Sequence, residues 1–245
     1  GVVVWSNPGA AGEQRILPDG CLDLIFDGDR LVVAGPDTSA RIHVSGSVAP
    51  GSVAPGSVGP GSVGPVIGVR LHGGRGPALL GVPADALTDS TLALEQLWGD
   101  RRARILAGRV ARDPARELAV WATSPDEGSG ALPGGPADGF GPLLLALLAR
   151  GAGIAEAAGV LGYSPRQLHR RSLPVFGYGP QHLGRVLRLQ RALAVADRGV
   201  GWATVAAQTG YADQAHLARD VRALTGVTPT ALRRERDVRS VQDAA

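Results

Sequence analysis

The chain has 245 residues, which is enough for two domains that each bury a core of their own. It holds one cysteine, Cys21, and no apolar run near 18 residues, which excludes a disulfide framework and a membrane-spanning helix and predicts a cytoplasmic protein. Residues 1–141 hold 11 arginines against 15 acids and residues 142–245 hold 14 against 7, an asymmetry that indicates a polyanion partner for the second part alone.

The first part of the chain has the pattern of short strands separated by turns. Pro18-Asp-Gly is a turn signal between two extended segments. In the next segment Leu22, Leu24 and Phe26 fall on one face, which predicts a strand with that face buried. The predicted strands span residues 2–5, 14–17, 21–26, 30–33, 41–44 and 66–71.

Residues 46–65 are four copies of the unit Gly-Ser-Val-Ala/Gly-Pro. Proline at every fifth position precludes a helix or a central strand, and the unit has little apolar surface to bury. We predict a flexible insertion in a loop. An elastic or binding repeat is the alternative interpretation.

A glycine-rich stretch, His72-Gly-Gly-Arg-Gly-Pro, follows the strand at 66–71. Its spacing matches neither a Walker loop nor a dinucleotide fingerprint, so we predict a tight turn and a short helix at 77–81. Two amphipathic helices are predicted at 101–110 and 114–121. Their apolar residues form core or a surface for a second copy of the chain: Ile105, Leu106, Val110, Leu118 and Trp121.

Residues 123–141 are rich in Gly, Pro, Ser and Asp, which is typical of a linker between domains. The sequence therefore predicts a two-domain α+β protein, with a β-rich N-terminal domain at 1–122 that carries a few helices. The C-terminal domain, 142–245, is predicted to be all-α with two helix-turn-helix motifs. Its predicted helices span residues 142–150, 154–161, 164–173, 180–198, 202–209, 213–224 and 229–238.

The C-terminal domain repeats one unit. Gly162-Tyr163 matches Gly210-Tyr211 at an offset of 48 residues. Further matches occur at an offset of 49: Leu168 with Leu217, Arg170 with Arg219, Gly177 with Gly226 and Pro180 with Pro229. Each copy has a short helix, a glycine turn and a capped second helix, the organisation of a helix-turn-helix that reads DNA. The helix between the copies would span about 25–28 Å, near the roughly 34 Å between successive major grooves.

The second helix of each copy carries the predicted DNA contacts. Ser164 and Gln167 form a capping box at the start of the first such helix. The residues predicted to read base edges are Arg166, His169 and Arg170 in the first copy and Gln214, Ala215 and Arg219 in the second. The residues predicted to contact phosphates are Ser164, Gln167, Arg171, Arg185, Arg188, His216, Arg222 and Arg233. Since Ala215 and Ala218 replace Arg166 and His169, the first copy should supply most of the base discrimination.

Residues 142–238 resemble the DNA-binding domain of the AraC/XylS family of bacterial transcription regulators. The resemblance lies in Ser164-x-Arg-x-Leu-x-Arg and in Gly210-Tyr-Ala-Asp-Gln-Ala-His-Leu-Ala-Arg, followed by Leu224-Thr-Gly-Val-Thr-Pro. It implies double-stranded DNA as partner, and RNA polymerase if the protein activates. Two departures, Ser172 in place of a large apolar residue and then Pro174, predict that the first recognition helix ends or kinks near residue 173.

The N-terminal part resembles an uncharacterised domain often attached to such regulators, through Leu17-Pro-Asp-Gly-Cys-Leu-Asp-Leu-Ile-Phe, Gly68-Val-Arg and Leu79-Leu-Gly-Val-Pro. That resemblance implies a domain that senses a small-molecule effector or forms a homodimer. Arg70 and His72 are the predicted effector-facing residues, because they stand at a strand end beside the glycine-rich turn.

We predict a regulator that has no catalytic activity, cofactor or metal. Other functions stay open beside this prediction. A cupin-like enzyme or metal-binding domain could use His43 and His72 as ligands or Cys21 as a nucleophile. Asp19 and Asp23 could form an acid–base pair, although turn and surface roles are commoner. An architectural DNA binder without sequence preference is the other alternative.

Overall fold

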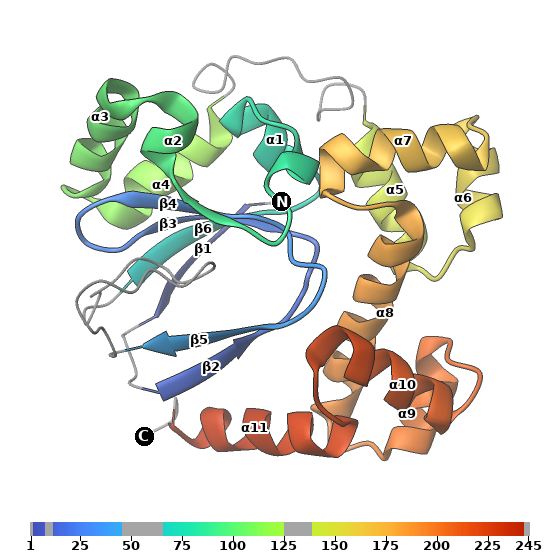
Figure 1. The fold of residues 1–245 in the computed structure, drawn as a ribbon. Helices are drawn as coiled ribbons and strands as arrows, with labels where there is room; N and C mark the ends of the chain where they lie inside the picture. The colour runs from blue at the N-terminus through green and yellow to red at the C-terminus, as the bar shows by residue number, and fades with distance from the viewer. Residues whose placement is uncertain (1, 8–11, 46–65, 125–138, 243–245) are drawn as a thin grey trace.

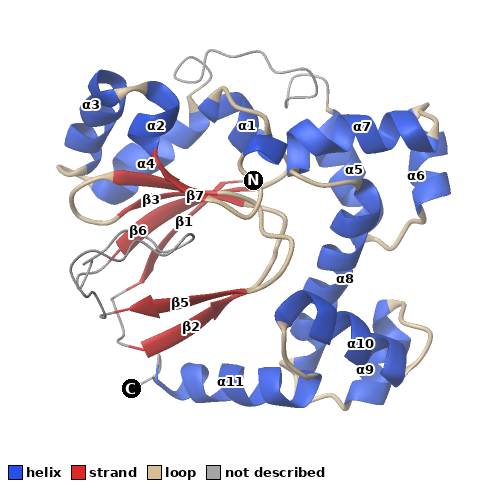
Figure 2. Cartoon of the chain, viewed as in Figure 1, coloured by secondary structure: helices blue, strands red, loops and turns tan. Residues whose placement is uncertain are grey.

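The computed structural model describes residues 2–7, 12–45, 66–124 and 139–242. The 46–65 repeat and residues 125–138 of the predicted linker therefore lie outside the described residues. Within the described part, strands dominate the front of the chain and helices make up the back, as predicted (Figures 1 and 2).

The strands of the N-terminal domain form two antiparallel sheets. The larger has the order β1 (Val2–Asn7), β6 (Val66–Leu71), β3 (Leu22–Phe26), β4 (Leu31–Ala34) and β7 (Thr91–Ala93). The smaller pairs β2 (Gly12–Ile16) with β5 (Arg41–Ser45). The predicted turn at Pro18-Asp-Gly joins the two sheets: the Asp19 side chain accepts from the Cys21 backbone N–H at 2.9 Å, and Gly20 has a φ of 79°.

Alternation along β3 directs its apolar side chains to a helical layer. Leu22, Leu24 and Phe26 belong to one buried cluster with residues of the helices that cover this face of the larger sheet (Figure 1). Those helices are α1 (Arg75–Leu80), α2 (Leu94–Trp98), α3 (Asp100–Val110) and α4 (Pro114–Thr123), and a short 3-10 helix, η1 (Ala84–Ala86), follows α1. The β2–β5 pair lies on the other side of the sheet (Figure 1). Of the apolar residues predicted for α3 and α4, only Ile105 is exposed, at 59%, and the other four are buried core.

The C-terminal domain holds two helical units around one long helix. Its helices are α5 (Phe140–Ala149), α6 (Ile154–Leu161), α7 (Pro165–Phe176), α8 (Pro180–Ala196), α9 (Trp202–Thr209), α10 (Gln214–Thr225) and α11 (Pro229–Gln242). The first unit has a buried cluster that includes Leu183 of α8, and the second has a separate cluster that includes Val186 and Leu189 of the same helix. The two predicted copies therefore fold as two units, each with its own core.

The repeated glycines end the first helix of each unit. Gly162 and Gly210 have φ values of 71° and 81°, a left-handed conformation that glycine adopts without a side-chain clash. The backbone N–H of Tyr163 then returns to Ala158 at 2.9 Å, and that of Tyr211 returns to Ala206 at 3.1 Å. Each turn thus satisfies a carbonyl at the helix end in the same way.

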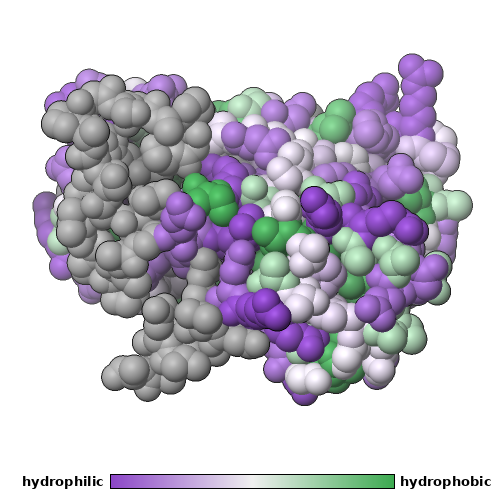
Figure 3. Space-filling view, turned by 60° about the horizontal axis from the view of Figure 1, so that its bottom comes forward, coloured by the Kyte–Doolittle hydropathy of each residue, from purple (hydrophilic) through white to green (hydrophobic). Residues whose placement is uncertain are grey.

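The large apolar side chains exposed on the described surface come from separate elements: Val3, Ile42, Ile105, Val120, Leu143 and Val160. On the face shown in Figure 3, hydrophobic residues form small patches separated by hydrophilic ones. Among the described helices, none combines the length and the apolar character that a membrane span requires.

Candidate nucleic-acid interface

The first recognition helix, α7, begins with the predicted capping box. The Ser164 hydroxyl accepts from the Gln167 backbone N–H at 3.3 Å, and the Gln167 side-chain oxygen accepts from the Ser164 backbone N–H at 2.9 Å. Pro165 occupies the first helical position, where its missing N–H costs nothing. The local sequence therefore specifies where this helix starts.

The two faces of α7 divide as predicted. Leu168, Ser172 and Val175 are buried, whereas Arg166 and Arg170 are exposed. Neither arginine makes an ion pair within the described part of the chain, so both guanidinium groups are free to meet an anion or a base edge.

His169 lies on the same exposed face, but its ring is directed toward Gly179. A Cβ at Gly179 would overlap the His169 ring, so the imidazole packs against the backbone of the turn that follows α7. Glycine at 179 leaves the space that this ring occupies.

Of the two outcomes predicted for α7 near residue 173, an end is wrong, and a kink stays a prediction. The helix continues to Phe176, with Pro174 inside its last turn, and ends where the Gly177 backbone N–H donates to Leu173 at 2.8 Å. Proline at this position removes only one hydrogen bond near the helix end, to the carbonyl of the exposed Arg170, which water can reach. Val175 and Phe176 offset that loss because both are buried.

Ser172, the other departure, is accommodated inside the unit. Its hydroxyl donates to the Leu168 carbonyl at 2.8 Å, so the buried polar group is satisfied.

The second recognition helix, α10, has a different cap and a sparser outer face. Asp213 accepts from the His216 backbone N–H at 2.6 Å, and His216 Nδ1 accepts from the Ala212 backbone N–H at 3.3 Å. Gln214, Ala215 and Arg219 are exposed, as the prediction requires. This face offers one guanidinium, one amide and a methyl group.

A buried acid, Asp220, ties α10 to α8. Its carboxylate lies 2.7 Å from Arg185 Nε and 3.6 Å from Arg188 Nη2, and it accepts from the Tyr211 hydroxyl at 3.3 Å. Burial and this carboxylate together raise the pKa of Tyr211 to about 12. The sequence analysis missed Asp220, although an acid on the apolar face of a helix is a signal for a buried ion pair.

Several predicted phosphate contacts are already engaged inside the protein. Arg185 and Arg188 pair with Asp220, and Arg171 stacks over Phe140 and Tyr163 at 4.8 and 5.0 Å. Arg233 stacks over Trp202 at 4.3 Å and donates to the Val200 carbonyl at 2.6 Å. Ser164 and Gln167 serve the helix cap, and Arg222 is exposed. As phosphate contacts, all of them stay predictions.

Both helix-turn-helix units present their turns on the same side of the molecule. In Figure 1 the α6–α7 turn and the α9–α10 turn lie on the right-hand side, away from the N-terminal sheets, and α8 runs between the units. The 17 residues of α8 span about 25 Å at 1.5 Å per residue. This arrangement suits two contacts along one face of a DNA duplex.

The two residues predicted to face an effector, Arg70 and His72, make different contacts. Arg70 forms ion pairs with Asp19 at 3.0 Å and Asp23 at 2.8 Å, and it lines a cavity of about 220 Å³. His72 is not among the residues that line this cavity, and its Nδ1 lies 3.0 Å from the Cys21 sulfur. The cavity lies between the domains and is lined by Arg15, Ile16, Leu17, Asp19, Arg70, Gln190, Leu232, Glu235 and Arg236.

The residues of the enzyme alternative are placed as follows. Burial raises the pKa of the Cys21 thiol and lowers that of His72, so burial favours the neutral form of both groups, whose sulfur and Nδ1 lie 3.0 Å apart. Asp19 and Asp23 both pair with Arg70. His43 is half-buried on β5. Within the described ranges no three His, Cys, Asp or Glu residues lie together as metal ligands.

The two halves of the chain match known families. Residues 157–235 match a family described as a helix-turn-helix domain, and residues 2–93 match a domain of unknown function, DUF6597. Among curated proteins no sequence match was found.

Solved structures of ToxT from Vibrio cholerae are similar at low identity. A form at 1.65 Å resolution has 10% identity and a TM-score of 0.47, covering 95% of this chain and 97% of ToxT. ToxT with a bound unsaturated fatty acid has 11% identity and a TM-score of 0.41, covering 94% and 93%.

Proposed function

We propose that the chain, a DNA-binding transcription regulator with an AraC-type helix-turn-helix domain behind a DUF6597 domain, reads a bipartite DNA site with two unequal recognition helices. The observation that carries this proposal is the difference between the exposed faces of α7 and α10 at corresponding positions. Arg166 and Arg170 are exposed on α7 without a described ion-pair partner, whereas at the matched positions of α10 only Arg219 is an arginine. Arginine can bind guanine O6 and N7 together, so α7 should supply most of the base discrimination.

Selection from random duplexes tests this reading. The purified full-length chain should enrich two half-sites about one helical turn apart, with a G·C-containing half-site more sharply defined than the other. Enrichment of no sequence at matched salt would favour an architectural binder and overturn the proposal.

We propose that a small-molecule effector binds in the cavity beside Arg70. A molecule there would contact β2, β6, α8 and α11, and it could shift the arrangement of the DNA-binding units only by binding one arrangement more tightly. Arg70→Gln should abolish a ligand response in a reporter strain and leave DNA selection unchanged. His72→Gln serves as its matched comparison; a response that survives both substitutions removes these residues from the effector site.

A regulator of this type acts where the genome is, so we place it in the cytoplasm of a bacterial cell. A homodimer through the N-terminal domain and contact with RNA polymerase during activation are consistent with this role. Sedimentation of the free protein and of its DNA complex would test the first.

A further inference from the structure

The N-terminal domain supplies hydrogen-bond donors to the C-terminal end of the second recognition helix. Arg15 on β2 donates from Nη1 to the Thr225 carbonyl at 2.9 Å. The Ala40 backbone N–H donates to the Leu224 carbonyl at 2.7 Å. The last carbonyls of an α-helix have no donor within the helix, so a different domain completes the cap of α10.

The same guanidinium also holds α11. Arg15 Nε donates to one Glu235 carboxylate oxygen at 2.9 Å, and Nη2 donates to the other at 3.3 Å. The Arg15 side chain is only 17% exposed, so this two-point contact is partly shielded from water. A cation at a helix C-terminus is also favoured by the helix dipole. We call the contacts of Arg15 with Thr225 and Glu235 the Arg15 clamp.

The connector between the recognition helices has a residue that weakens it locally. Gly184 lies inside α8, between Leu183 of the first core and Val186 of the second. No close neighbour requires glycine there, because the nearest atom to an added Cβ would be 4.0 Å away. Glycine is less favourable than alanine inside a helix, because its backbone is less restricted, so α8 should yield most easily at this point.

We propose that Arg15 is a positioning residue for DNA reading: the Arg15 clamp sets the placement of α10 relative to α7 across the Gly184 joint. The inference rests on the proposed reading of two half-sites. Arg15 and Glu235 also line the cavity beside Arg70, so a bound effector would touch the clamp directly. The N-terminal domain therefore controls which half-site spacing the protein accepts.

The experiment measures binding of the full-length chain to a set of duplexes whose selected half-sites are moved apart or together by one and two base pairs. The wild type should lose about tenfold or more in affinity when the spacing changes by two base pairs. Arg15→Ala should lose no more than about threefold over the same set, because α10 can then follow the displaced half-site. Arg15→Lys keeps the positive charge but lacks the planar guanidinium that makes two hydrogen bonds to Glu235. Its loss of affinity over the set should lie between that of the wild type and that of Arg15→Ala.

Two matched variants separate positioning from simple destabilisation. Arg30→Ala removes the same charge from an arginine whose ion pair within the described residues is with the neighbouring Asp27, and it should retain the wild-type spacing profile. Gly184→Ala combined with Arg15→Ala stiffens α8 and should restore part of the spacing discrimination. A spacing profile of Arg15→Ala that equals the wild type, or parallel loss at both half-sites without rescue by Gly184→Ala, overturns the inference. Failure to select any duplex would instead overturn the proposed function.

Discussion

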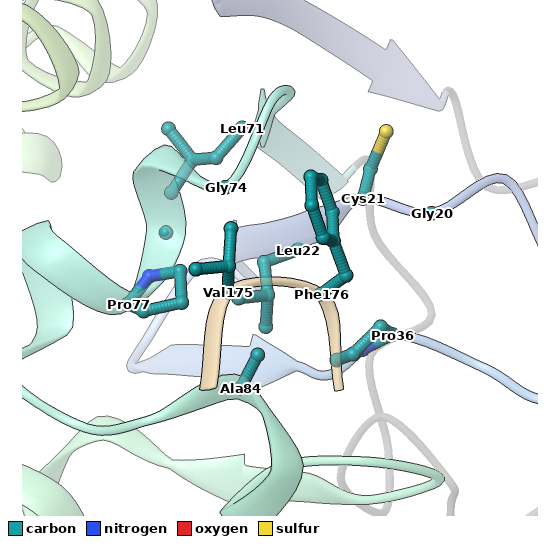
Figure 4. Close-up of a pocket in the computed structure, with 11 residues that line it drawn as sticks. Gly20, Cys21, Leu22, Pro36, Leu71, Gly74, Pro77, Ala84, Val175 and Phe176 are labelled. Atoms are coloured by element: carbon teal, nitrogen blue, oxygen red, sulfur yellow. The ribbon is translucent and has the colours of Figure 1, made fainter. Parts of the chain in front are cut away.

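The two helix-turn-helix units share one backbone plan but meet the N-terminal domain through different kinds of contact. The end of α7 is held mainly by apolar contact: Val175 and Phe176 lie against Leu22, Leu71 and other N-terminal residues around a cavity of about 10 Å³, room for a single water (Figure 4). One hydrogen bond accompanies it, from the Thr88 hydroxyl to the Gly177 carbonyl at 3.0 Å. The end of α10 is polar, because its last carbonyls accept from Arg15 and Ala40.

This difference predicts different mobility for the two units. At the offset of 49 residues Phe176 corresponds to Thr225, so an apolar anchor in one copy stands where the other has a hydroxyl. Leaving an apolar contact exposes hydrocarbon to water, whereas polar groups exchange partners with water at a small net cost. The first unit is therefore held to the N-terminal domain by apolar burial, whereas the position of the second depends on the Arg15 clamp and the Ala40 hydrogen bond, and it should become adjustable when the clamp is removed.

The two units also differ in their interiors. Asp220 corresponds to Arg171 at the same offset. In the first unit Arg171 stacks on Tyr163, and in the second Arg188 stacks on Tyr211 at 4.7 Å while Asp220 supplies the counter-charge. Each unit thus places an arginine over the tyrosine of its turn, and in the second unit the buried Asp220 carboxylate lies 3.6 Å from that arginine.

The largest effect should come from breaking the apolar anchor. Phe176→Ala should lower the free energy of unfolding by about 3–5 kcal/mol, because the ring is fully buried at the domain junction. Thr225→Ala, at the matched position, should cost only about 1 kcal/mol through the lost hydroxyl hydrogen bond to Val221. Denaturant unfolding of the full chain measures both. Equal losses would mean that the two junctions do not differ as described.

A somewhat smaller loss should follow removal of the buried acid. Asp220→Asn should cost about 3 kcal/mol, because it leaves Arg185 and Arg188 without a counter-charge, although both arginines can partly reach water. Amide exchange should rise in α9 and α10 before it rises in α7. The control is Asp197→Asn, an exposed partner of Arg236, which should cost under about 1 kcal/mol. Uniform exchange across both units would contradict independent cores.

The unequal outer faces predict unequal effects on DNA. Arg166→Ala should cost about 1–3 kcal/mol on the selected duplex and relax the preference at one G·C pair. Arg219→Ala tests the single arginine of the other face and should change preference only in the second half-site. Competition between selected and random duplexes measures this. Equal loss of affinity on both kinds of duplex would show that Arg166 contacts phosphate instead of a base.

The smallest effect concerns the exposed arginine at the end of α10. Arg222→Ala should reduce the slope of affinity against salt by about 1 and leave base preference unchanged. Titrations at three salt concentrations measure the slope. A changed base preference would move Arg222 from the phosphate contacts to the reading face.

Much of the fold follows from local pattern. Ser164 and Gln167 specify the start of α7, and Gly162 and Gly210 specify the turns, because caps and left-handed turns depend on neighbours within a few residues. The strand at Val66–Leu71 and the helix at Ile154–Leu161 have the predicted bounds. The end of α7 was mispredicted because Pro174 was weighed without the burial of the residues that follow it.

The β-rich front, the helical back and the two helix-turn-helix copies can be predicted from the amino-acid order, because hydrophobic period and turn chemistry are local and a repeat is recognised by comparing the chain with itself. The different ways in which the two copies are held become visible only in the folded molecule. Arg15 lies 210 residues from Thr225, and Arg185 lies 35 residues from Asp220. Pairings over such distances have no periodic signature, because their energy arises only when separate elements bring a donor and an acceptor together.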